Sequence, residues 1–154
     1  MGGWRVGCAG RLFGYAVDNM DFPAKVPGLK WITAVYALFA FVWIALEGSL
    51  VGVLLMGVGS TAVSLACLSQ HFLGGRPFSA KQWWGMTAVL GLLFGLGSGL
   101  LTLLFMAVKT GLHSHGPEFT PPEVAWIIRQ IPLWTAVGLL AGLGLGLLTS
   151  KGRN

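Results

Sequence analysis

The residues best suited to chemistry lie in one polar stretch, Lys109 to Thr120, where His113 and His115 flank a serine and Glu118 follows three positions later. Two imidazoles at this spacing can face one ion, and a nearby carboxylate can complete a three-ligand zinc site with an open position. One alternative is therefore a metal site formed by His113, His115 and Glu118, with Glu123 as a further carboxylate. The other is a solvated loop that contacts a partner protein.

No pattern of residues predicts catalysis or a bound cofactor. The sequence has no P-loop, nucleophile elbow, zinc-protease HExxH or dinucleotide fingerprint, and its glycine runs at 95–99 and 142–146 lie within apolar segments where no phosphate is cradled. Cys8 and Cys67 are far apart and form neither a CxxC pair nor a disulfide framework. We expect no catalytic residue, no cofactor and no enzymatic activity from this chain alone.

The composition predicts a membrane protein. Of 154 residues, 55% are hydrophobic and only 10% are charged, and the mean hydropathy is +0.74, whereas soluble domains carry about 25% charged residues. The net charge of +5 does not indicate nucleic-acid binding, because the ten basic residues are scattered and sit mostly beside apolar segments. Basic residues placed in this way act as topology signals.

Four apolar segments are candidates for membrane spans. The clearest, 84–108, is a charge-free run of 25 residues bounded by Lys81 and Lys109, long enough to cross a hydrocarbon core of about 30 Å. The apolar stretch 31–68 is too long for one helix, so we divide it at Glu47 into spans at 31–46 and 50–68; a fourth span covers 133–148. The expected fold is all-α: a polytopic membrane protein with four transmembrane helices in an antiparallel bundle.

The segments outside the spans carry weaker signals. Apolar residues spaced by four predict a short amphipathic helix over 4–20 within the N-terminal segment 1–30, with an irregular tail as the alternative. Thr120-Pro121-Pro122-Glu123 is typical of a helix N-terminus. Because Pro132 follows soon after, we expect either a short interfacial helix ending near Ile131 or a kinked start to the fourth span. Residues 149–154 form the C-terminal tail.

Small residues recur at helical spacing in three of the spans, which favours close packing between helices. The third and fourth spans carry Gly91, Gly95, Gly99, Gly138, Gly142 and Gly146, and we expect these two faces to pack together. Gly52, Met56, Ser60 and Ser64 form a similar stripe on the second span, which we expect to face the third. The span interiors hold no Asp, Glu, Lys, Arg or His, which argues against proton-coupled transport.

The basic residues also predict the orientation. With four spans, eight of them share one side of the membrane (Arg5, Arg11, Lys25, Lys30, Arg76, Lys81, Lys151 and Arg153), whereas Lys109 and Arg129 lie on the other. The positive-inside rule then places both termini in the cytoplasm, and we expect the plasma membrane as the location.

The function that fits these features is a structural or accessory subunit of a larger membrane complex, with the lipid bilayer and other membrane subunits as partners. We expect the segment 109–131 to be its docking surface, with Glu123, Trp126 and Arg129 in contact with the partner. One alternative is a homo-oligomeric channel or carrier for a small neutral solute. A third is a metal-binding protein that uses the outer histidines.

The metal alternative makes a direct prediction. If His113 and His115 hold zinc, the double variant H113A/H115A loses the zinc that co-purifies with the protein, because two of three ligands are removed. Elemental analysis of the purified protein measures this loss. His71 lies on the opposite side of the membrane in the expected topology, so H71A is the control, and equal zinc contents in both variants would exclude the site.

Overall fold

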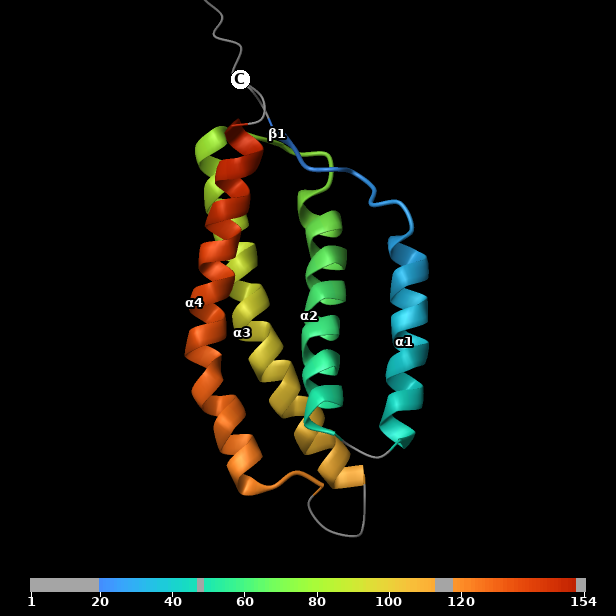
Figure 1. The fold of residues 1–154 in the computed structure, drawn as a ribbon. Helices are drawn as coiled ribbons and strands as arrows, with labels where there is room; N and C mark the ends of the chain where they lie inside the picture. Colours follow the sequence, from blue (N-terminus) through green and yellow to red (C-terminus); the bar gives the residue numbers. More distant parts are fainter. Residues whose placement is uncertain (1–19, 47–48, 113–117, 152–154) are drawn as a thin grey trace, which may run out of the picture.

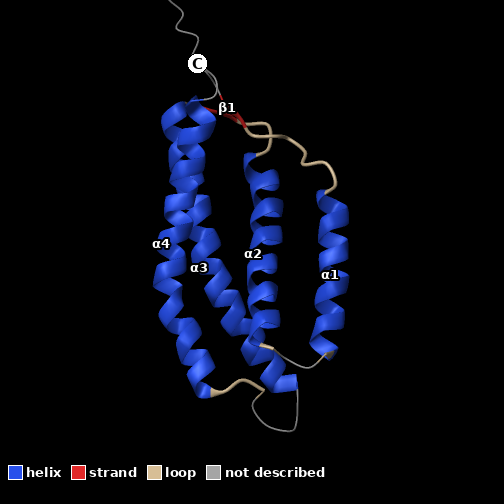
Figure 2. Ribbon diagram, in the orientation of Figure 1, coloured by secondary structure: helices blue, strands red, loops and turns tan. Residues whose placement is uncertain are grey.

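A computed structural model describes residues 20–46, 49–112 and 118–151 (Figure 1). The elements run in the order β1 (Met20–Asp21), α1 (Leu29–Ala45), α2 (Leu50–Leu73), β2 (Pro77–Phe78), α3 (Ala80–Leu112) and α4 (Pro121–Lys151). Apart from two short strands, the ordered elements are helices, which confirms the all-α prediction (Figure 2). The predicted amphipathic helix at 4–20 lies outside the described residues.

Three helices, α2, α3 and α4, are long and apolar enough to cross a membrane. The fourth, α1, is apolar but has 17 residues, a length of about 25 Å at 1.5 Å per residue. Membrane insertion is therefore supported by three long helices, and α1 falls slightly short of a full hydrocarbon core.

Of the two alternatives expected at Pro132, the structure contradicts the short interfacial helix, whereas a fourth apolar helix that begins before Pro132 is what it contains. Residues 121–131 are not a separate interfacial helix, because α4 continues through Pro132 from Pro121 to Lys151. Proline removes one backbone donor, but such breaks are tolerated in membrane helices when neighbouring elements hold the chain. Here Ile131 and Trp134, on either side of Pro132, both pack against glycines of α3.

The start of α4 lies where the sequence predicts it. Glu123 Oε2 accepts hydrogen bonds from the Thr120 backbone amide at 2.7 Å and from the Thr120 hydroxyl at 2.8 Å. These contacts fix the chain at the first turn of the helix.

The helices lie in chain order, each antiparallel to the next, as Figure 1 shows. The packing is most extensive between α3 and α4, less so between α2 and α3, and least between α1 and α2. Among the described residues, α1 and α4 do not pack extensively on each other. The arrangement is therefore an open row of helices in which α3 holds both α2 and α4.

Helices α3 and α4 meet through their glycines. A Cβ atom added at Gly91 would collide with the backbone of Gly138 and Gly142, and one at Gly95 would collide with the backbone of Trp134. At Gly99 it would lie 2.5 Å from a side-chain carbon of Ile131. The two backbones therefore approach too closely for any side chain at these positions.

On α2, two neighbouring faces serve different partners. The Gly57 face packs on α3, where an added Cβ would collide with Thr102. Gly52 instead faces Trp43 of α1, and Ser60 shares a 2.8 Å hydrogen bond with the Tyr36 hydroxyl of α1. The expectation that this stripe faces α3 is therefore wrong for Gly52 and Ser60, which face α1, whereas Met56 lies in the core that Met106 of α3 shares.

The strand end of the molecule, where β1 and β2 lie, ties the N-terminal segment to the α2–α3 connection. The two strands pair antiparallel, and the Gly75 amide donates to the Phe22 carbonyl at 2.9 Å. The Val26 amide donates to Gln70 Oε1 of α2 at 3.2 Å. Residues 20–28 are therefore fastened along the end of α2.

The glycine contacts predict a position-dependent response to alanine. We expect G91A and G138A each to lower the free energy of unfolding by about 1–3 kcal/mol, because the new methyl meets backbone that cannot rotate away. Unfolding by sodium dodecyl sulfate in mixed micelles measures this change.

Gly85 of α3 and Gly144 of α4 are matched controls, since an added Cβ meets nothing within 4 Å at either position. G85A and G144A should leave stability unchanged or raise it by up to about 1 kcal/mol, the difference in helix propensity. An equal loss in all four variants would contradict the packing described.

Candidate functional site

At the opposite end of the molecule from the strands, the side chain of Lys109 is buried. It belongs to the last turn of α3 and is 1% exposed. Its ammonium donates to the backbone carbonyls of Trp43, at 3.4 Å, and Leu46. It also lies 4.3 Å from the centre of the Trp43 ring. The Trp43 carbonyl belongs to the last turn of α1, where it also accepts a hydrogen bond from the Leu46 amide at 3.1 Å, and the Leu46 carbonyl belongs to the C-cap that follows.

A cation at this point has two favourable interactions with α1. It satisfies carbonyls at the negative end of the helix dipole, and it sits against the face of a tryptophan that is itself 6% exposed. Lys109 therefore caps α1 from a neighbouring helix, and it compensates for the limited packing of α1 on the rest of the molecule.

Glu118 brings the segment before α4 into the same cluster. Its Oε1 lies 3.6 Å from Lys109 Nζ, and its side chain is 17% exposed. The next residue, Phe119, is 5% exposed and belongs to the apolar core with Trp43, Val53, Met56, Met106 and Ile127. The Lys109 cluster, defined as Lys109, Trp43 and Glu118, thus joins α1, α3 and the approach to α4.

The structure describes only some of the predicted site residues. His113 and His115 lie outside the described residues, so the metal site they form with Glu118 stays a prediction. Among the residues that are described, no three His, Cys, Asp or Glu side chains are grouped to hold a metal ion. Glu123 caps α4, while Trp126, at 44% exposed, and Arg129 lie at the surface of α4.

An apolar groove, here named the α2/α4 groove, runs over α3. Its volume is about 270 Å³. The residues that line it are Leu54 and Val58 of α2, Phe94, Gly95 and Ser98 of α3, and Trp134, Val137, Gly138 and Ala141 of α4. The Ser98 hydroxyl donates to the Phe94 carbonyl of its own helix at 2.7 Å. The hydroxyl proton of this serine is therefore used within its own helix, and the groove stays largely apolar.

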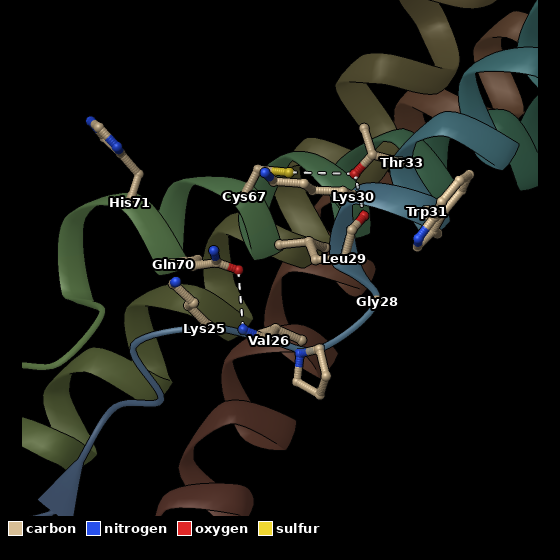
Figure 3. Close-up of a pocket in the computed structure, with 11 residues that line it drawn as sticks. Lys25, Val26, Gly28, Leu29, Lys30, Trp31, Thr33, Cys67, Gln70 and His71 are labelled. Atoms are coloured by element: carbon tan, nitrogen blue, oxygen red, sulfur yellow. Dashed lines mark hydrogen bonds between the residues drawn. The ribbon is translucent and has the colours of Figure 1, made fainter.

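A second cavity, here named the strand-end cavity, lies between the start of α1 and the last turns of α2 (Figure 3). Its volume is about 890 Å³. Lys25, Lys30 and Gln70 line it together with the half-buried pair Thr33 and Cys67. The Thr33 hydroxyl and the Cys67 sulfur are 3.7 Å apart.

The sequence did not predict where three lysines lie. Lys109 was expected in a loop, but α3 extends to Leu112 and draws it into the core. Lys25 and Lys30 counted only as topology signals. One signal in the sequence could have indicated the position of Lys109: it comes directly after the longest apolar run. A lysine at such a place can remain in the helix while its long side chain extends to the end of another helix.

Comparison with protein families, with curated proteins and with solved structures finds no significant match to this chain.

The buried position of Lys109 predicts a large loss of stability on its removal. We expect K109M to lower the free energy of unfolding by about 3–5 kcal/mol, the usual effect of deleting one partner of a buried charged pair. Chemical denaturation in detergent micelles measures the loss.

K81M is the matched control, because Lys81 lies on the same helix and is exposed. That substitution should change stability by no more than about 0.5 kcal/mol. If the two variants unfolded alike, Lys109 would not hold α1 in place.

Proposed function

We propose that this chain is a non-catalytic integral membrane subunit whose α2/α4 groove receives a transmembrane helix of a different membrane protein. The observation that carries the proposal is the open row of helices. Gly91, Gly138 and Gly142 are used within the chain to join α3 to α4, and the groove beside that contact is left uncovered.

The lining of the groove favours a helix as its occupant. In a bilayer, apolar surface alone gives no preference for protein over lipid, and association depends on close packing at small residues. Gly95 and Gly138 are filled by the contact between α3 and α4, but two further small residues, the buried Ser98 and the exposed Ala141, also line the groove. A partner helix can therefore bring its side chains close to the backbone of α3.

The proposed membrane arrangement has four spans, with α1 as the shortest. Both termini lie in the cytoplasm of a cell whose plasma membrane holds the protein. The support is the unequal distribution of basic residues, eight against two, in the sequence. Lys109 is one of the two basic residues on the other side of the membrane. It is buried beside Glu118, so its charge is not exposed there.

Residue-specific photo-crosslinking in native membranes tests the groove. A photoreactive residue at Ala141 or Val58 should give one discrete product with a second, non-identical membrane chain, because both positions line the groove. The substitution A141W should reduce co-purification of that chain at least tenfold, since the indole occupies the space of the partner helix.

Leu140 is the matched control, adjacent in sequence, 66% exposed and outside the groove. A probe at Leu140 should give no such product, and L140W should leave co-purification unchanged. Adducts with lipid alone at Ala141, or with a second copy of this chain alone, would overturn the proposal, the latter in favour of the homo-oligomeric alternative.

A further inference from the structure

We infer that the strand-end cavity binds the phosphate headgroup of an anionic phospholipid. The inference rests on the proposed membrane insertion of α1, because it places the cavity at the level of the lipid headgroups. The cavity lies where α1 begins and α2 ends, beside Trp31, which is 78% exposed. Tryptophan at such a position is typical of the membrane interface.

The charge of the cavity favours an anion. Lys25 and Lys30 line it, and Figure 3 shows both side chains extending toward α2. Among the described residues, no aspartate or glutamate contributes to its lining. The first turn of α1 adds its positive dipole end, and its N-cap, Gly28, has no side chain to bind the amides there.

The structure also holds one wall of the cavity in place. The pairing of β1 with β2 and the bond from the Val26 amide to Gln70 fix the segment that carries Lys25 against α2. Lys30 follows on the first turn of α1. The backbone that carries the two lysines is therefore fixed before a phosphate binds, so ordering of this segment adds little to the entropy lost on binding.

The cavity has an apolar side that a lipid chain can use and a soluble anion cannot. Leu29 is 8% exposed, and Thr33 and Cys67 continue the lining between α1 and α2. Below them the two helices present apolar residues along their length. A phospholipid thus places its phosphate at the lysines and the start of an acyl chain against Leu29, Thr33 and Cys67.

Native mass spectrometry of the full chain in detergent, titrated with phosphatidylglycerol or phosphatidylcholine, tests the inference. We expect preferential binding of phosphatidylglycerol. The variant K25Q/K30Q should weaken that binding roughly 30-fold, as expected when two lysines facing anionic lipid are neutralised.

R76Q/K81Q is the matched control, because it removes two exposed charges from the same end without altering the cavity. It should leave phosphatidylglycerol binding within about threefold of wild type. Equal losses in the two variants would show a non-specific surface charge effect and overturn the inference, as would equal binding of the two lipids. Displacement by inorganic phosphate at the concentration of the lipid would show a soluble-anion site and overturn the lipid assignment.

A second measurement does not depend on the folding of a lysine variant. In a C8S background, maleimide labelling of Cys67 should slow at least fivefold with phosphatidylglycerol and not with phosphatidylcholine, because the lipid covers the thiol. Unchanged labelling would contradict the inference. Resistance of the protein to carbonate extraction is scored separately, so that a failure of membrane insertion is distinguished from a failure of lipid binding.

Discussion

The close approach of α3 and α4 at their glycines is the constraint on which the rest of the structure depends. Because the two backbones touch at Gly91, Gly95 and Gly138, the register and separation of the helices are set by main-chain contact rather than by side-chain choice. This leaves another face of α3 for α2, which uses Gly57 in the same way. Helix α1 then packs mainly on α2 and contributes Trp43 to the shared core near its C-terminal end. The open row and its groove both follow from this order of contacts.

The weakly packed helix α1 is held at its two ends by polar interactions of different kinds. At one end, Lys109 of α3 binds the terminal carbonyls of α1 and the ring of Trp43. At the other, the N-terminal segment leading into α1 is fastened to α2 through Val26 and Gln70. Between them, the Tyr36 hydroxyl donates to the Met56 carbonyl at 2.7 Å. Polar contacts gain importance in a bilayer because lipid offers no competing donors or acceptors to the chain. Such tethers hold a short helix where apolar packing alone is limited.

Much of the helical framework could be predicted because it depends on local properties. Apolar runs marked the helices, and Thr120 with Glu123 marked the start of α4 through a contact within four residues. The predictions that were wrong concern which other helix a residue contacts. Pro132 did not end α4, since α3 supports the helix on both sides of it. Gly52 faces α1 rather than α3, and the burial of Lys109 depends on a carbonyl more than sixty positions away in the chain. Spacing gives the face of a helix but not the identity of the partner on that face.

We propose that this chain completes an assembly with a different membrane protein. The most direct test is its native mass after extraction from its own membranes in mild detergent, with every co-purifying chain identified. We expect a complex that contains one other integral membrane chain at fixed stoichiometry. A particle with the mass of a single chain, or a ring that contains only copies of this one, would contradict it.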